Sequence, residues 1–209
     1  MTDTKARIAA GLERAFAENG FSEPNIDSLR EAAGVSLRTL YKYMPSREEM
    51  VLSALEHRHR RYMQFVFDDL PGDGPTVLHL VLDRIAQWMS KEASHGCLFH
   101  AAVASAPRDE RLRALLAKHK NEVAEKTSEV SGLQEHQGEV ALIVEGLMQA
   151  WPLYGENATR SAKNLCDTLL NETSATGLKN SGSLPSAEDR SHEADPMSAS
   201  VSKAFPRSN

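Results

Sequence analysis

A glycine between two short amphipathic stretches most strongly limits how this chain can fold. The sequence NIDSLREAAGVSLRTLYKYM, residues 25–44, places Gly34 between them. Asn25 and Ser36 are residue types that cap helix N-termini, and Pro45 ends the second stretch. Glycine readily adopts the positive φ that a sharp turn between two helices needs. The segment is therefore predicted to be a helix-turn-helix, whose second helix can enter the major groove of DNA.

The flanking sequence also has helical spacing. Ile8, Leu12 and Phe16 predict a helix that ends at Asn19-Gly20. Ser46 with Glu49 forms a capping box for a long helix after Pro45. Further helices are predicted over 76–93, 98–105, 109–131, 137–151 and 158–172. No alternating strand pattern competes, so the expected fold class is all-α: an N-terminal three-helix helix-turn-helix DNA-binding domain followed by a larger helical domain.

The chain is expected to divide into three regions. Residues 1–47 form the DNA-binding domain and residues 48–173 a second helical domain. Residues 174–209 contain nine serines but only four Leu, Ile, Val or Phe residues. Such a segment cannot bury enough apolar surface to offset the entropy of ordering it, so a disordered tail is predicted.

Composition points to a cytoplasmic protein without a membrane segment. Of the 209 residues, 41% are hydrophobic, yet the longest strongly apolar run is Val140–Val144, far short of the about 20 residues that span a bilayer. Cys97 and Cys166 form no CxxC pair and no disulfide framework, which favours a reducing compartment. The net charge of −5 argues against a protein that binds nucleic acid over its whole surface. The basic residues are concentrated near the N-terminus, since residues 1–62 carry ten Lys and Arg against nine Asp and Glu.

Residues 32–50, AAGVSLRTLYKYMPSREEM, together with the preceding helix and Gly20-Phe21, resemble the TetR family of transcriptional regulators. The resemblance covers roughly residues 6–62 well. It is looser in the second half of the chain, in GCLFHAAVA at 96–104 and in EGLMQAWPLYG. It implies a symmetric homodimer that binds a palindromic double-stranded DNA operator and represses until a small molecule enters the helical domain. Residues 48–173 would then be the helical ligand-binding, or effector-binding, and dimerisation domain.

The predicted second helix of the motif, residues 37–44, carries the candidate DNA-binding side chains. Arg38 and Lys42 lie four apart on one face, and an arginine can read guanine through two hydrogen bonds. By matching position, the resemblance implies that Tyr41 and Arg47 contact phosphates. The expected DNA-binding residues are Ser36, Arg38, Thr39, Tyr41, Lys42, Tyr43 and Arg47, and the alternative is a merely solvated helix face. Arg30 stands where such motifs usually hold a small residue, so its side chain is expected to extend outward.

Flexible methionines and flat aromatic residues in the second domain suggest a cavity for an apolar or amphipathic effector. The candidates are Met63, Phe67, Trp88, Met89, Phe99, His100, Val103 and Trp151, and for any single one of them ordinary core packing is the favoured interpretation. His100 would orient a polar end of the effector, and few inward-facing charges are expected. Cys97 has no adjacent Lys or Arg and is expected to be a structural thiol. The spacing of the histidines predicts no metal site, and no cofactor is expected.

In the resembled family the last two long helices of each chain form a four-helix bundle in the dimer. The resemblance therefore implies an interface at Val140, Ile143, Leu147, Leu165 and Leu169, with Gly146 allowing close approach. A rival hypothesis is a helical ligand-binding protein or enzyme in which the helix-turn-helix is only scaffold. No glycine-rich phosphate loop, nucleophile elbow or paired catalytic carboxylates support an enzyme. An activator, or a regulator with a closed and empty cavity, is a third alternative.

Overall fold

The computed structural model describes residues 3–72, 74–93 and 95–180, and within these residues every regular element is helical. The all-α prediction is confirmed. The helices in chain order are α1 (Asp3–Asn19), α2 (Ile26–Ala33), α3 (Leu37–Tyr43), α4 (Arg47–Phe67), α5 (Pro75–Glu92), α6 (Leu98–Ser105), α7 (Glu110–Ser131), the single 3₁₀ turn η1 (Gln134–His136), α8 (Gln137–Tyr154) and α9 (Glu156–Asn180).

Helices α2 and α3 form the expected helix-turn-helix. The Asn25 side chain accepts a hydrogen bond from the Ser28 amide at 2.9 Å and caps α2. Gly34 ends this helix with φ of 63°, which is the left-handed conformation that glycine accommodates without strain. Ser36 then accepts a hydrogen bond from the Thr39 amide at 3.1 Å and caps α3. Local capping and the glycine turn thus set the bounds of both helices.

Helices α1 and α2 approach each other closely at Gly11. A Cβ atom placed on Gly11 of α1 would lie 2.7 Å from the Cα of Ala33, well inside van der Waals contact. Arg30 does not obstruct the packing, because its side chain is 39% exposed and reaches Asp27 at 3.6 Å. The outward course predicted for Arg30 is confirmed.

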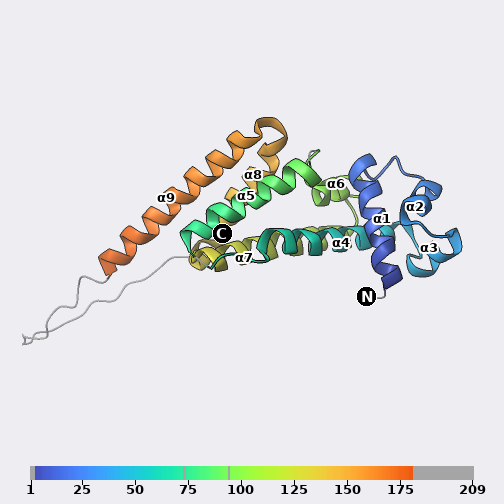
Figure 1. Ribbon diagram of the computed structural model, residues 1–209, viewed down its shortest axis with the longest axis horizontal. Coiled ribbons are helices and arrows are strands. Elements are labelled where there is room, and N and C mark those ends of the chain that lie inside the picture. Colours follow the sequence, from blue (N-terminus) through green and yellow to red (C-terminus); the bar gives the residue numbers. More distant parts are fainter. Residues whose placement is uncertain (1–2, 73, 94, 181–209) are drawn as a thin grey trace, which may run out of the picture.

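Helix α4 links α1–α3 to the remaining helices (Figure 1). It packs against α1, α5 and α7, and its contacts with α1 extend to Arg61. Met50 and Leu55 are buried toward the start of α4, and Tyr62 and Val66 toward its end. One continuous hydrophobic core therefore runs from α1 into the helical body. The body places α8 and α9 at the end farthest from α3 (Figure 1).

The last helix continues beyond its expected end. Sequence spacing predicted a helix to 172 and a disordered tail from 174, but α9 continues to Asn180. The end predicted from composition was too early. A helix that has already formed gains one backbone hydrogen bond with each added residue, so it can continue where few apolar side chains follow. The rest of the predicted tail, 181–209, lies outside the described residues, and the division at 47 and 48 stays a prediction. None of the described helices is both long and apolar enough to cross a membrane.

Candidate nucleic-acid interface and interior cavities

Helix α3 turns its polar side chains to solvent. Arg38, Tyr41 and Lys42 are exposed, whereas Leu40 is fully buried and anchors the helix. Thr39 and Tyr43 are half-buried; the Thr39 hydroxyl lies 2.8 Å from that of Ser36, and the Lys42 ammonium lies 5.7 Å from the Tyr43 ring centroid. The short helix α3 therefore presents the Arg38 guanidinium, the Tyr41 phenol and the Lys42 ammonium to solvent. Its buried residue Leu40 holds the helix against the rest of the domain. Such a surface can read base edges and bind phosphates.

Arg47, by contrast, is already engaged within the protein. Its Nη2 donates a hydrogen bond to the carbonyl oxygen of Phe21 at 2.7 Å, and its guanidinium lies 5.8 Å from the Phe16 ring centroid. The side chain is half-buried. Arg47 therefore fastens the loop after α1 to the start of α4, and a contact with phosphate stays a prediction.

The predicted effector cavity is almost closed. The enclosed space has a volume of about 10 Å³, which is room for about one water molecule. Of the candidate residues, only Trp88 and Phe99 line it. Met89 is fully buried core, while Trp151 lines a separate surface hollow with Asp83 and Arg84. Met63, Phe67 and Val103 are partly buried against the core, and His100 accepts a hydrogen bond from Gln149 at 2.9 Å.

The interior is more polar than the sequence suggested. Arg58, Tyr62 and His119 line the small cavity, and all three are buried. Burial raises the pKa of Tyr62 far above its usual range. The expectation of few inward-facing charges did not include Arg58, which is 3% exposed and lines this cavity. Its partners lie on other helices.

Cys97 is a buried free thiol, but the premise that no nearby group lowers its pKa was wrong. Burial raises the pKa of the Cys97 thiol, whereas a hydrogen bond with His100 and the charge of Lys120 lower it. The lowering effects are larger, and the pKa is about 7. His100 follows Cys97 by three residues at the start of α6, so this partner could have been identified from helical spacing. The cysteines are free and buried, and the described residues contain no group of three His, Cys, Asp or Glu side chains that could hold a metal ion.

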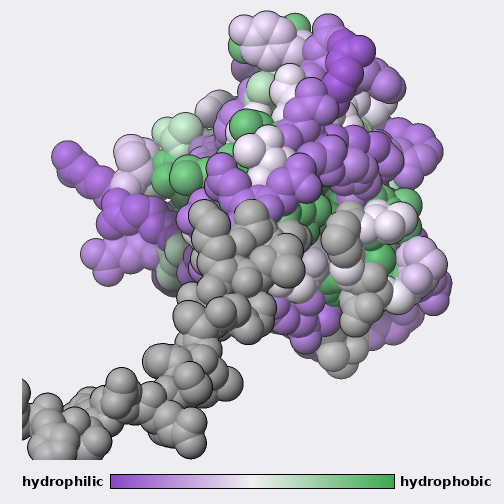
Figure 2. Space-filling view, turned by 90° about the vertical axis from the view of Figure 1, so that its left-hand side faces the viewer, coloured by the Kyte–Doolittle hydropathy of each residue, from purple (hydrophilic) through white to green (hydrophobic). Residues whose placement is uncertain are grey.

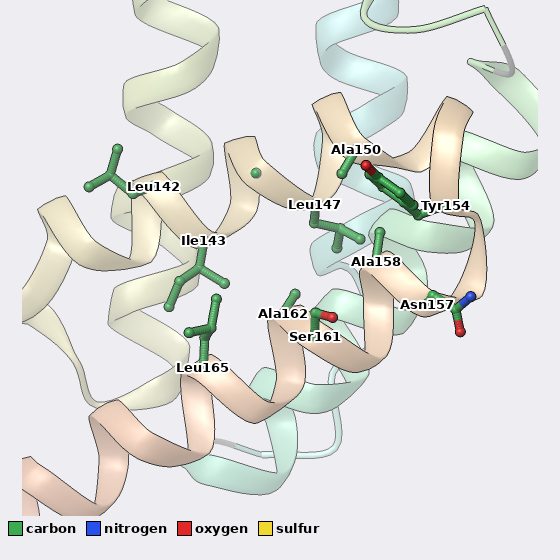
Figure 3. A pocket seen from close by; sticks show the side chains of 11 residues that line it. Leu142, Ile143, Leu147, Ala150, Tyr154, Asn157, Ala158, Ser161, Ala162 and Leu165 are labelled. Atoms are coloured by element: carbon green, nitrogen blue, oxygen red, sulfur yellow. The ribbon is translucent and has the colours of Figure 1, made fainter.

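An apolar groove of about 520 Å³ lies between α8 and α9 (Figure 3). Leu142 and Leu165, which line the groove, are 75% and 57% exposed. Apolar side chains also reach the surface among polar ones at this end of the molecule (Figure 2). Ile143 and Leu147 line the groove as well, but Leu147 and Val140 are buried inside the protomer, and Leu169 is half-buried. Val140 is thus a core residue, not an available contact for another chain.

Comparisons with known proteins agree with this architecture. Residues 8–54 match the family model for bacterial regulatory proteins of the tetR family. A TetR-family transcriptional regulator from Streptomyces coelicolor has 20% identity and a TM-score of 0.66, over 82% of this chain and 96% of that one. A putative TetR-family regulator from a Rhodococcus species has 20% identity and a TM-score of 0.64, over 80% and 98%. Reduced NemR from E. coli has 18% identity and a TM-score of 0.58, over 79% and 96%.

No curated protein matches the chain. The family match covers α1, α2, α3 and the start of α4, which are the helices that build and support the exposed face of α3. The similar structures extend the shared fold through the helical body. The chain therefore carries a TetR-family helix-turn-helix DNA-binding domain, and the rest of it shares the fold of TetR-family transcriptional regulators.

Proposed function

We propose that this protein is a homodimeric repressor that binds a palindromic operator and is released from it by a small amphipathic molecule. The exposed face of α3 is the observation that carries this proposal. Its Arg38 and Lys42 project from a helix whose N-terminus is capped by Ser36 and whose Leu40 is buried. The regulator acts in the cytoplasm, where its operator is accessible.

Within this proposal Arg38 reads a base edge, because its planar fork matches the two acceptors of guanine. Lys42 and Tyr41 contact phosphates on either side of the groove, and Thr39 and Tyr43 complete the surface. Ser36 contributes chiefly by fixing the N-terminus of α3. Phosphate contacts supply affinity for DNA of any sequence, whereas Arg38 supplies the preference for a particular base.

Dimerisation through α8 and α9 is the second part of the proposal. The groove between them offers exposed Leu142 and Leu165 beside Gly146, whose Cβ position is open. An exposed apolar surface of this kind marks an interface in soluble proteins. Two copies related by a twofold axis would then present their α3 helices to two half-sites of one operator.

Selection of DNA fragments with purified protein, followed by binding isotherms at several salt concentrations, tests the proposal. Operator affinity should fall steeply with salt, and Lys42→Ala should flatten that dependence by about one unit of slope on specific and random DNA alike. Arg38→Ala should cost about 1–3 kcal/mol on the operator and relax one position of each half-site. Salt-independent binding, or no binding at all, would favour the rival hypothesis that the motif is only scaffold.

A further inference from the structure

A carboxylate of the DNA-binding unit is buried against three basic groups of α4. Glu13 of α1 is 2% exposed. Its Oε1 accepts hydrogen bonds from Arg58 at 3.0 Å and from Arg61 at 2.7 Å, while Oε2 lies 2.6 Å from Nδ1 of His57. We call Glu13, Arg58 and Arg61 the arginine hub. It fixes α1 to α4 by charge-assisted hydrogen bonds in addition to apolar packing.

The same two arginines also reach the helical body. Arg58 donates a hydrogen bond to the carbonyl oxygen of Glu92 at 2.6 Å, and Arg61 pairs with the Glu92 carboxylate at 3.0 Å. Both guanidinium groups lie over the Trp88 ring, at 5.1 and 5.3 Å from its centroid. Glu92 and Trp88 belong to α5. The arginine hub therefore joins the DNA-binding unit to α5 through α4.

The arginine hub is not sealed from solvent. A cleft of about 580 Å³ lies between α1 on one side and α5 and α6 on the other, and Glu13, Arg58, Arg61 and Glu92 line it. Phe16, Leu98 and Ala101 give the cleft an apolar wall. The exposed cations Arg14 and Lys91 also line it. The cleft has the size of a small-molecule site and combines an apolar wall with convergent guanidinium groups.

We propose that this cleft is the effector site and that the effector is a carboxylate with a compact apolar body, whose carboxylate takes the place of Glu13 on Arg58 and Arg61. The inference rests on the repressor function proposed above. A planar carboxylate reproduces the two-pronged hydrogen bonding that Glu13 now provides. The buried guanidinium of Arg58 thus stays paired throughout the exchange, which avoids the large cost of leaving it alone.

The charge of the arginine hub sets this selectivity. A neutral guest can lie against the apolar wall but offers no negative charge to displace Glu13, so α1 stays attached to α4. A cationic guest meets the guanidinium groups of Arg58 and Arg61, which repel it. The carboxylates of Glu13 and Glu92 are already paired with these arginines, so Glu18 is the remaining anion of the cleft lining. Only an anion both occupies the cleft and competes with Glu13. Release of α1 from α4 then shifts α3 relative to the body and lowers operator affinity.

Trp88 provides a direct readout of binding. It stacks on both arginines, whereas the second tryptophan, Trp151, is half-buried and lies beside a different hollow. The full chain with Trp151→Phe therefore reports on the arginine hub alone. The probes are cyclohexanecarboxylate and octanoate, compared with cyclohexanecarboxamide and octanamide and with cyclohexylmethylamine. None of these compounds fluoresces.

We expect the two carboxylates to change Trp88 fluorescence saturably, and the amides and the amine to leave it unchanged. Glu13→Gln removes the internal competitor while keeping the shape of the side chain, so it should tighten carboxylate binding about tenfold. Arg61→Gln removes a guanidinium that is 37% exposed and should weaken it by a similar factor. Arg111→Gln is the matched control, because Arg111 forms a 2.7 Å ion pair with Glu49 between α7 and α4, away from the cleft, and binding should not change.

The same probes are then added to the complex with operator DNA, where the carboxylates should lower affinity about tenfold. The inference is overturned if the amides release the operator as readily as the carboxylates do. It is also overturned if wild type and Arg61→Gln bind the carboxylates equally. In either case the repressor function stands. A chain that binds no operator but shows the Trp88 response refutes the repressor function and supports the carboxylate site. Because Arg61 is partly exposed, its variant tests the site even if Glu13→Gln does not fold.

Discussion

The imidazole of His119 in α7 lies face to face with the ring of Phe99 in α6, with centroids 4.0 Å apart and planes inclined by 6°. His119 is 1% exposed, and its Nδ1 lies 2.9 Å from Nδ1 of His59. Burial, followed by the positive charges of Lys120 and Arg58 and by the neighbouring His59 and His100, lowers the pKa of His119 to about 2. The fold therefore requires this histidine to be neutral.

The first prediction is a loss of stability in mild acid. The folded-state pKa of His119 lies below the value of about 6.5 in the unfolded chain, so the unfolded state binds the proton first. The contribution of His119 is complete above about pH 6.5 and declines as the pH falls, at a rate approaching about 1.4 kcal/mol per pH unit. Urea unfolding at a series of pH values measures this slope.

His119→Phe should remove most of that pH dependence, because a phenyl ring can stack on Phe99 without titrating. His136→Gln is the control, since His136 is half-buried beside Glu139 at 3.7 Å rather than enclosed. An undiminished slope in His119→Phe would show that other groups cause the loss in acid.

The helix-turn-helix could be predicted from the sequence because its determinants are local. Asn25, Gly34 and Ser36 each act within three or four residues, and the structure has the bounds that they indicate. The arginine hub could not be predicted in the same way. Glu13 and Arg58 are far apart in sequence, and only the crossing of α1 and α4 brings them together.

One signal of the arginine hub was nonetheless present. Glu13 lies four residues after Ala9 and three before Phe16, on their apolar face of α1. Arg58 lies on the same stripe of α4 as Leu55 and Tyr62. A charged residue on the apolar face of a predicted helix requires a partner on a facing helix. The predicted dimer residues show a related limit. Periodicity finds an apolar face, but it does not tell whether the same chain covers the face, as at Val140, or leaves it open, as at Leu142.

The second prediction concerns the two thiols. With a pKa of about 7, Cys97 should react with iodoacetamide at a rate that rises through neutral pH as its thiolate forms. Burial raises the pKa of Cys166 to about 11, so this thiol serves as an unreactive internal reference. His100→Ala removes the hydrogen bond to Cys97 and should slow its alkylation at neutral pH about tenfold. Peptide mass spectrometry after timed alkylation separates the two sites, and equal labelling of both would contradict the prediction.

The third prediction concerns the groove between α8 and α9. Leu142→Glu places a charge on a side chain that is 75% exposed in the protomer, so it should leave the fold intact and convert a dimer into monomers. Leu153→Glu, at 78% exposure on the same helix but outside the groove, is the matched control and should remain dimeric. Leu147→Glu would instead unfold the protomer, because Leu147 is 2% exposed. Sedimentation velocity distinguishes these results, and a dimeric Leu142→Glu protein would place the interface elsewhere.

The last prediction concerns the crossing of α1 and α2, which sets the position of α3. In Gly11→Ala the added Cβ would meet the α2 backbone at Ala33, and backbone cannot yield as a side chain does. Helix α2 must shift, at a cost of about 1–3 kcal/mol or more in unfolding free energy. Gly138→Ala is the matched control, because its Cβ would meet open space in a helix, and it should stabilise the protein by about 0.5–1 kcal/mol.

Since α3 follows α2 after the Gly34 turn, Gly11→Ala should also reduce operator affinity at a temperature where the protein remains folded. Circular dichroism measures the folded state and a binding isotherm measures the affinity. Full operator affinity in a folded Gly11→Ala protein would show that the position of α3 does not depend on this crossing.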